Sequence, residues 1–436
     1  MGHLIGHDQP YLALQARLGQ KVQGAPASPT LLAILGKLFT PQEAELASRL
    51  PHNLVALDDL ARRLGQPEQE LDERLSAMAQ RGVVFDLELG GRRYFTLPPV
   101  VIGFFEFVFM RSRDELPVAE LAALFEQYFY ENDGALLRTV GAGQTQLVRT
   151  LVQEEALPRE SPAEVLDWER ATRIVASAEA LAVGLCQCQH LAEHLGQACA
   201  KPREVCLSFD FAAASLVRAG HARAIDRERA QAILAESKAA GLAQIGDNVQ
   251  RRVSFICNCC GCCCHIMRGI RGFGAGAGSI ACNWIMEVDR SRCQGCGECA
   301  KACPVSAIRL EKVHDGQRTR AWAVRDETFC LGCGVCAGIC KTGGAKMRPR
   351  EQRLLVPETI FEQRLAMAIE RGKLADLLAD DPGRLSHRAL GKVVAALEKC
   401  TPFQAAMAAA PLKSAFLKLL AAGARRQAGP LADLFA

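Results

Sequence analysis

Residues 293–304 read CQGCGECAKACP, and residues 330–341 read CLGCGVCAGICK. Both stretches space four cysteines as C-x2-C-x2-C-x3-C, with Pro304 after the first run and Lys341 at the matching place after the second. Thiols at such short intervals wrap one tight turn, so their sulfur atoms converge on a common centre. The repeated spacing predicts that these eight cysteines are metal ligands rather than disulfide partners.

The rest of the composition supports a chain that binds metal in a reducing compartment. Of 436 residues, 20 are cysteines; none precedes Cys186, and only Cys400 follows Cys340. The net charge of +4 favours neither nucleic acid nor a membrane surface. MGHLIGHDQPYLALQ lacks a signal-peptide pattern, and the most apolar stretch, LPPVVIGFFEFVFM, is too short to span a membrane. We therefore expect a soluble cytoplasmic protein, in which Cys400 alone is a buried small hydrophobe.

The two runs predict two 4Fe-4S clusters, because three thiolates of a run reach one iron cube and the fourth reaches the other. Residues 289–345 resemble the bacterial ferredoxin domain with two such clusters. The resemblance implies one cluster on Cys293, Cys296, Cys299 and Cys340, and the other on Cys330, Cys333, Cys336 and Cys303. Lys341 replaces a usual proline, which loosens that turn but removes no ligand. Structural zinc is the alternative, and the repeated spacing disfavours it.

Two groups of cysteines, ten thiols together, lie upstream of these runs. CQCQHLAEHLGQACAKPREVC contains Cys186, Cys188, Cys199 and Cys206, which we expect to hold a third 4Fe-4S cluster. FICNCCGCCCHIMRG places Cys257, Cys260 and Cys263 in a C-x2-C-x2-C frame, with Cys259 and Cys262 interleaved and Cys264 beyond. We expect this stretch to hold a fourth cluster, or one of less usual form. Two zinc sites are the alternative.

Ten thiols are two more than two cubes require. The spare thiols are interpreted as a redox-active pair, as ligands of a larger cluster, or as one thiol at an open site. His190 and His265 lie beside the cysteines, and we expect each to be held by hydrogen bonds rather than by metal.

Residues 29–99 contain short helical patterns followed by a hairpin pattern. The helical stretches are LLAILGKLF, PQEAELASRL, VALDDLARRLG and EQELDERLSAMAQRG, and Pro67 precedes the last one. VVFDLELGGRRYFTL alternates around Gly90-Gly91, as a two-stranded wing does. This order resembles a winged helix-turn-helix domain. The last helix carries Glu68, Glu70, Asp72 and Glu73 against Arg74 and Arg81, so a protein-interaction or structural role is favoured over DNA binding.

The expected fold class is α+β, in four segments. They are a winged-helix-like domain (1–100), a helical cysteine-rich domain with further Fe-S sites (101–288), a two-cluster ferredoxin domain (289–350) and a helical extension (351–436). Residues 210–245 predict two helices, LEKVHDGQRTRAWAVRDETF predicts a hairpin around Asp315-Gly316, and RGFGAGAGSI predicts a connector rather than a phosphate loop.

Residues 1–345 are similar to large bacterial and archaeal 4Fe-4S dicluster-domain proteins. Those proteins combine a winged-helix-like front, a C-x-C-x-H segment followed by two further cysteines, a CCxCCC-type segment and a ferredoxin domain. The resemblance implies architecture more than function.

Three functions fit the sequence. The first is an electron-transfer protein or oxidoreductase subunit, as in anaerobic metabolism, which passes single electrons to or from a partner protein. The second is a catalytic reductase with an unusual Fe-S or dithiol centre at residues 257–264. The third is a redox-sensing regulator, against which the acidic helix counts. The sequence contains no specific flavin- or nucleotide-binding motif. An electron carrier or oxidoreductase subunit is therefore favoured over a stand-alone enzyme.

Overall fold

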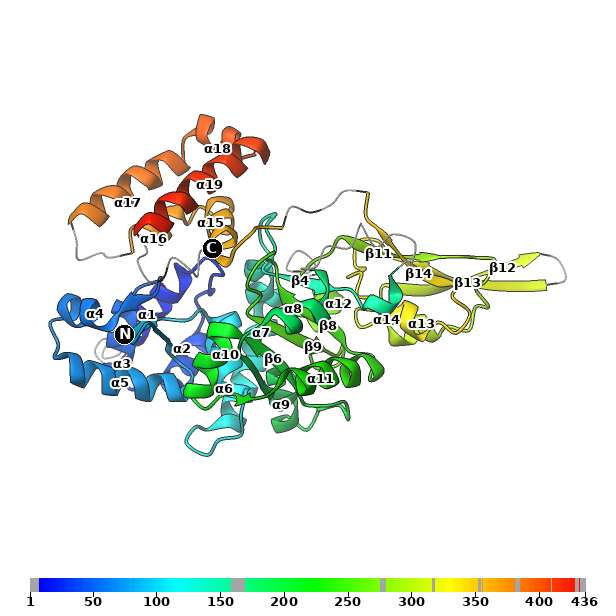
Figure 1. Cartoon of the computed structure of the whole chain (residues 1–436), viewed down its shortest axis with the longest axis horizontal. Helices are drawn as coiled ribbons and strands as arrows, with labels where there is room; N and C mark the ends of the chain where they lie inside the picture. The colour runs from blue at the N-terminus through cyan, green and yellow to red at the C-terminus, as the bar shows by residue number, and fades with distance from the viewer. Residues whose placement is uncertain are drawn as a thin grey trace, which may run out of the picture. The chain divides into compact units, whose positions relative to one another are not determined.

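The computed structural model describes residues 8–157, 169–274, 280–315, 318–351, 354, 356–380, 385–408, 410–427 and 431. It combines helices with four separate sheets, which confirms the expected α+β class (Figure 1). The chain forms two compact units. Unit 1 comprises Met1–Thr145, Ala214–Ala222 and Pro357–Ala436, and unit 2 comprises Gln146–Ala213 and Arg223–Val356. The four-segment division expected from composition stays a prediction.

The front of unit 1 has the helices and the hairpin that the sequence predicts, preceded by one helix that was not predicted. Its elements are α1 (Gln9–Gly19), α2 (Pro29–Leu38), α3 (Pro41–Arg49), β1 (Val55–Ala56), α4 (Leu57–Leu64), α5 (Glu68–Arg81), β2 (Phe85–Leu89) and β3 (Arg92–Thr96). The three strands form an antiparallel sheet in the order β1-β3-β2. Ser28 caps α2, and Thr40 and Glu43 form a capping box on α3. The winged-helix assignment itself stays a prediction.

The most apolar stretch of the chain is an aromatic core inside unit 1. It forms η1 (Val100–Phe104) and α6 (Phe105–Phe109), which pack against α7 (Val118–Val140). The Phe105 ring lies 5.2 Å from that of Phe125 and 4.9 Å from that of Phe129, between ring centroids. Offset and edge-to-face aromatic contacts of this kind stabilise a core beyond simple burial. Among the described residues, no helix combines the length and apolarity that a membrane crossing requires.

The tail of the chain is helical, as expected, and belongs to unit 1. Its helices are α15 (Ile360–Glu370), α16 (Leu374–Leu378), α17 (Leu385–Glu398), α18 (Thr401–Ala408) and α19 (Ala410–Gln427). The buried carboxylate of Asp380 fastens the tail to the front of the unit. It accepts hydrogen bonds from Arg17 Nη2 at 2.7 Å, from the His52 amide at 2.7 Å and from the Asn53 amide at 2.9 Å.

A second buried carboxylate, Asp86, connects the hairpin to the inserted segment 214–222. Its side chain accepts from Arg218 Nε at 2.8 Å and from Arg93 Nη2 at 3.1 Å, and its carbonyl accepts from Ser215 Oγ at 2.6 Å. An unpaired carboxylate buried at this site would cost several kcal/mol, on the order of 3–5, so these partners are integral to unit 1.

Unit 2 contains a seven-stranded sheet in the region that was expected to be helical. Its order is β10-β4-β8-β9-β6-β5-β7, antiparallel except for the β10–β4 pair. The strands are β4 (Val148–Leu151), β5 (Leu181–Leu185), β6 (Glu204–Phe209), β7 (Arg223–Ala224), β8 (Ala243–Asp247), β9 (Phe255–Cys259) and β10 (Ile280–Ala281). The helical expectation was wrong here because the strands are short, and β4 and β8 are buried on both faces, which removes the polar–apolar alternation of a strand.

Helices alternate with these strands along the chain. They are η2 (Glu154–Ala156), α8 (Ala171–Ser177), α9 (Gln187–His194), α10 (Asp210–Arg218), α11 (Arg227–Ala239) and α12 (His265–Phe273). Along the chain, α9 precedes and α12 follows the cysteine-bearing strands β6 and β9, while α10 and α11 are the two helices predicted within 210–245. The predicted connector RGFGAGAGSI (271–280) begins with the last three residues of α12 and ends at the first residue of β10, and its residues 275–279 lie outside the described residues.

The pH dependence of unit 1 tests the burial of His221. This ring is 3% exposed; Nε2 donates to the Ala79 carbonyl at 2.8 Å, and Nδ1 accepts from Arg113 Nη2 at 3.1 Å. Burial and the neighbouring arginine lower the pKa of His221 to about 4. Because the unfolded chain takes up the proton first, the stabilisation is complete above pH 6.5 and falls as the pH drops to 4, by about 3 kcal/mol.

We therefore expect the stability difference between the native chain and His221→Gln to shrink by about 2–3 kcal/mol between pH 7.5 and 4.5. The measurement is the opening free energy of α5 amides by hydrogen exchange, corrected for intrinsic exchange rates. A difference that stays constant across this range contradicts the prediction.

Candidate metal centres

Two short helices and a pair of two-stranded sheets carry the repeated cysteine runs. β11 (Trp284–Val288) pairs with β14 (Ala345–Pro349), and β12 (Ile308–Asp315) pairs with β13 (Arg318–Arg325). The latter two strands form the hairpin expected between the runs, and residues 316–317 between them lie outside the described residues (Figure 1). Each run forms a loop that enters a helix, α13 (Glu298–Ala302) or α14 (Val335–Ile339), and its fourth cysteine, Cys303 or Cys340, ends that helix.

The thiols of the two runs meet in a crossed pattern. Cys299 interacts electrostatically with Cys293, Cys296 and Cys340, and burial together with these neighbours raises its pKa. In the same way, burial and the thiols of Cys333, Cys330 and Cys303 raise the pKa of Cys336. Each set thus takes three cysteines from one run and the last cysteine from the other, which is the arrangement that the ferredoxin resemblance implies.

Cys336 also interacts with Cys299, so the two sets are neighbours. An apolar cluster of Val152, Trp284, Met286, Met347 and others packs against both sets. Backbone amides point at the sulfurs that end each helix: Ala307 N donates to Cys303 Sγ at 3.2 Å, and Ala345 N donates to Cys340 Sγ at 3.3 Å. Amide donors of this kind stabilise a thiolate and tune the metal that it binds.

Glycine is required at one position of each run because the chain turns back against its neighbours. Gly295 and Gly332 have φ values of +65° and +62°. A β-carbon at Gly295 would lie 2.5 Å from the Ala321 carbonyl oxygen, and one at Gly332 would lie 2.1 Å from that of Trp284 and 2.4 Å from Cys282 Sγ. The loops are therefore closed cradles, which fit compact clusters wrapped by backbone.

Cys282 was not singled out from the sequence, yet it lies beside the second run. It is buried, accepts from the Trp284 amide at 3.3 Å, and interacts with Cys330 and Cys333. Burial raises its pKa to about 12. Cys282 stands outside both C-x2-C-x2-C-x3-C runs, so spacing carried no signal for it. Its position is set by β11, which starts two residues later.

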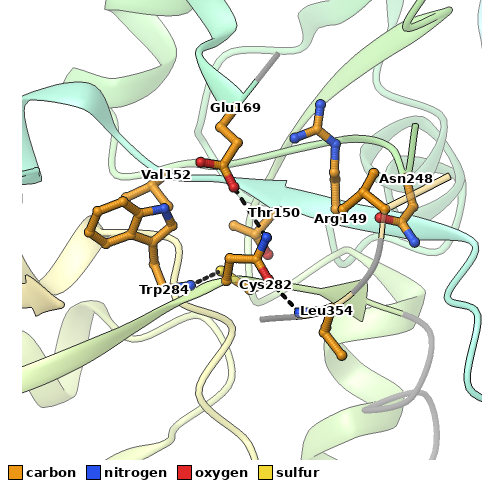
Figure 2. A pocket seen from close by; sticks show the side chains of 10 residues that line it. Arg149, Thr150, Val152, Glu169, Asn248, Cys282, Trp284 and Leu354 are labelled. Atoms are coloured by element: carbon orange, nitrogen blue, oxygen red, sulfur yellow. Dashed lines mark hydrogen bonds between the residues drawn. The ribbon is translucent and has the colours of Figure 1, made fainter. Parts of the chain in front are cut away.

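Cys282 also lines a small pocket with Trp284, Arg149, Thr150 and Glu169 (Figure 2). Glu169 accepts from Asn283 Nδ2 at 3.2 Å, and the Leu354 amide donates to Asn283 Oδ1 at 2.8 Å across the pocket wall. Burial lowers the pKa of Arg149 to about 10, so its guanidinium still carries a charge near neutral pH. None of the lining residues comes from the 257–264 stretch.

Six of the upstream cysteines converge at one end of the seven-stranded sheet. Cys206 lies on β6 and Cys257 and Cys259 on the neighbouring β9, while Cys186 and Cys264 cap the starts of α9 and α12. Hydrogen bonds between side chains connect Cys206 to Cys257, Cys257 to Cys259, Cys259 to Cys264, and Cys264 to Cys188. We call this group the six-thiol set; its members are Cys186, Cys188, Cys206, Cys257, Cys259 and Cys264.

The pKa values of the thiols in the six-thiol set shift in opposite directions. Hydrogen bonds from Cys206 and Cys259 lower the pKa of Cys257, and hydrogen bonds from Cys188 and Cys259 lower the pKa of Cys264. Burial raises the pKa of Cys186. Metal binding and thiol deprotonation are coupled. More than two of these thiols can therefore be deprotonated at the same time when a cation is bound.

The other four upstream cysteines form a separate, tighter group. The Sγ atoms of Cys199, Cys260, Cys262 and Cys263 all lie within 4.8 Å of one another. We call this group the four-thiol set.

This division differs from the one expected, in which Cys199 joins Cys186, Cys188 and Cys206, and residues 257–264 act as one site. The reason is geometric. Cys257 and Cys259 are two residues apart on β9 and therefore lie on the same face of the strand, whereas the turn at 261–263 brings Cys260, Cys262 and Cys263 to Cys199. His190 lies 3.3 Å from His194 between Nε2 atoms, while His265 is buried beside Cys264.

Cys400, expected to be a buried hydrophobe, is exposed. That expectation was wrong because the residue falls in the turn between α17 and α18, where its side chain meets solvent.

Substituting Gly332 tests whether the loop of the second run must pack tightly against its neighbours to hold a cluster. Gly332→Ala forces a β-carbon into Trp284 and Cys282, and we expect about half of the iron of the two runs to be lost on anaerobic purification. Gly90→Ala is the matched control, because Gly90 has a similar φ of +59° but meets nothing within 4 Å. Both variants carry the left-handed strain of about 1–2 kcal/mol, so only the steric clash distinguishes them. Full iron in Gly332→Ala contradicts the assignment.

Comparison with known proteins agrees with this geometry in one region. Residues 292–344 match the sequence model of the 4Fe-4S dicluster domain. No curated protein and no solved structure matches the chain. The match covers both cysteine runs and the hairpin between them, whose loops and thiols fit two clusters. Residues 292–344 are a 4Fe-4S dicluster domain, and the chain is an iron–sulfur protein with two 4Fe-4S clusters in this domain.

Proposed function

We propose that this chain is an electron-transfer protein or oxidoreductase subunit that moves single electrons between a buried thiol-rich centre, the dicluster domain and a partner protein, in a reducing compartment such as the cytoplasm. A bound 4Fe-4S cluster supplies one-electron oxidation and reduction. As ligands we assign Cys293, Cys296, Cys299 and Cys340 to one cluster and Cys330, Cys333, Cys336 and Cys303 to the other. The six-thiol set is assigned to one further Fe-S cluster.

The observation that carries the proposal is the backbone contact between the turn at residues 260–263, which directly follows Cys259 of the six-thiol set, and the dicluster domain. Gly261 packs against Pro304, and a β-carbon at Gly261 would lie 2.2 Å from the Pro304 carbonyl oxygen. Pro304 follows Cys303, and Gly261 stands between Cys260 and Cys262. The chain therefore brings its thiol groups into one contiguous region rather than scattering them over unit 2.

Exposure orders the thiol groups from inside to outside. In the set next to the upstream thiols, Cys333 and Cys336 are buried and Cys303 and Cys330 are half-buried. Cys293, Cys299 and Cys340 of the other set are half-buried, and Cys296 is exposed. This gradient supports an exchange of electrons with a partner at the outer set, because proteins exchange electrons most readily where a cluster approaches the surface.

The surface around the outer set fits an acidic partner. Residues 290–350 contain twelve Lys or Arg against five Asp or Glu, a surplus of seven positive charges. Lys341 is exposed directly after Cys340, and Ile339, directly before it, is 43% exposed. An apolar side chain within a basic rim is the composition expected of a transient docking surface.

The catalytic alternative has less support. It requires a substrate pocket beside residues 257–264, whereas the pocket beside Cys282 is lined by other residues. The regulatory alternative requires a basic helix for DNA. On α5, Asp72 pairs with Arg93, and Glu68, Glu70 and Glu73 remain exposed. Its surface potential is thus unfavourable for phosphate.

Charge reversal at Lys341 tests the docking surface. We expect Lys341→Glu to slow electron transfer to an acidic flavodoxin about 3–10-fold at low salt, with the effect fading at high ionic strength. The measurement is stopped-flow oxidation of the dithionite-reduced chain. Lys399→Glu, which makes the same charge change in unit 1, is the control. Equal rates for the two variants contradict docking at this surface.

Iron counting tests the six-thiol set. We expect about twelve irons and an equal amount of sulfide per anaerobically purified chain, against about eight for the dicluster domain alone. Cys257→Ser should lower the count by about four and leave the EPR signals of the dicluster domain unchanged, whereas Cys400→Ser should change neither. A count near eight in the native chain removes the third cluster from the proposal.

A further inference from the structure

The four-thiol set has the dimensions of a site for one metal ion. Cys199 Sγ lies 3.8 Å from Cys260 Sγ, and Cys262 Sγ lies 3.9 Å from Cys263 Sγ. Four sulfurs placed tetrahedrally around one ion at about 2.3 Å are separated by about 3.8 Å along each edge. The separations are also far longer than the roughly 2.05 Å of a disulfide, so the four thiols gather without bonding to one another.

A cubane cluster requires a wider set of ligands, because each thiolate binds a different iron and inorganic sulfide fills the space between the irons. The dicluster domain gives the internal comparison. Its eight cysteines are all among the described residues, and they form no group of three or more whose sulfurs all lie within 4.8 Å, whereas the four-thiol set does. The chain therefore contains two kinds of cysteine group, one with widely separated sulfurs (the wide group) and one with closely spaced sulfurs (the narrow group).

Hydrogen-bond donors surround the narrow group as they surround metal-bound thiolates. Gln189, which is 2% exposed, donates from Nε2 to Cys199 Sγ at 3.1 Å. The Cys263 amide donates to Cys260 Sγ at 3.4 Å across the turn. Arg271 donates to the Gly261 carbonyl, which brings a positive charge to the turn that carries three of the thiols. Such contacts orient ligands and offset the excess negative charge of four thiolates on a dication.

We propose that Cys199, Cys260, Cys262 and Cys263 bind a single zinc ion. Four thiolates in a closed tetrahedron are the ligand set of structural zinc, which has no redox chemistry and no preference for another geometry. The ion joins the loop after α9 to the turn after β9, and the turn in contact with Pro304 is thereby held in place. Zinc here fastens the region between the upstream thiols and the dicluster domain and takes no electron itself.

Metal analysis of the full chain tests the assignment without any substitution. The chain is purified anaerobically, and zinc, iron and sulfide are measured. We expect one zinc per chain, and X-ray absorption at the zinc edge should give a single shell of four sulfurs at about 2.3 Å with no neighbouring metal. Absence of zinc, or nitrogen and oxygen ligands around it, overturns the proposal.

Substitutions then locate the ion. Cys262→Ser is the first choice because Cys262 is exposed and the change perturbs packing least; Cys199→Ser tests a ligand from a different segment. Both should lose the zinc and keep the iron content and EPR signals of the native chain. Cys257→Ser, in the six-thiol set, should show the reverse: its zinc stays and its iron falls.

Three results contradict the site. Loss of about four irons in Cys262→Ser would make the set part of an iron–sulfur cluster. One iron in place of zinc, with the EPR signal of isolated high-spin ferric iron after oxidation, would overturn the choice of metal. Zinc retained in both Cys262→Ser and Cys199→Ser would place the ion elsewhere. Failure of the third cluster in iron counting leaves the zinc site standing, so the two proposals fail separately.

Discussion

More than two clustered, buried thiols become thiolates together only when a cation binds them, and this constraint shapes unit 2. Burial raises the pKa of Cys186, Cys333 and Cys336, so each of them alone would stay protonated at neutral pH. Metal binding reverses this preference by replacing the proton with a stronger positive charge. The stability of the region is therefore tied to its metal content, and the packing around the cysteines must leave room for ions and clusters.

The chain gathers thiols in two different ways. In the dicluster domain, tight turns bring the cysteines together. Three cysteines lie along one loop, and glycines with positive φ allow the loop to close against Trp284 and Ala321. In the six-thiol set, strand pairing in the sheet brings the cysteines together. β6 and β9 lie side by side, and Cys206 and Cys257 meet across them, while Cys186 and Cys264 arrive at the starts of helices. Local geometry suffices in the first case, and long-range strand pairing is required in the second.

This difference has a consequence for electron flow. In the outer set of the dicluster domain Cys296 is exposed, whereas in the six-thiol set Cys188, Cys206, Cys259 and Cys264 are buried and the other two cysteines are half-buried. Gly261 and Pro304 join the two regions through backbone contact. The proposed electron path runs from the six-thiol set through the dicluster domain to the surface, where Lys341 and Ile339 flank Cys340. Unit 1 contains none of these ligands, and its buried carboxylates Asp86 and Asp380 serve its own assembly.

The dicluster domain, most helices of unit 1 and the helical tail could all be predicted from the order of the residues. Those features depend on short-range rules: cysteine spacing, helix caps at Ser28 and Thr40, and the Gly90-Gly91 turn all act within a few residues. The sequence-based prediction missed the seven-stranded sheet, because strands buried on both faces have no alternation to detect. It also missed Cys282, which no spacing connects to its neighbours.

The division of the ten upstream cysteines into two sets depends on the folded chain and could not be predicted from their order. Along the chain, Cys199 is close to Cys188 and Cys206, and residues 257–264 form one block. In space, β9 and the turn after it separate that block, and Cys199 joins Cys260, Cys262 and Cys263. The physical reason is that a strand points alternate side chains to opposite faces, while a turn redirects the chain, so neighbours in sequence become ligands of different sites.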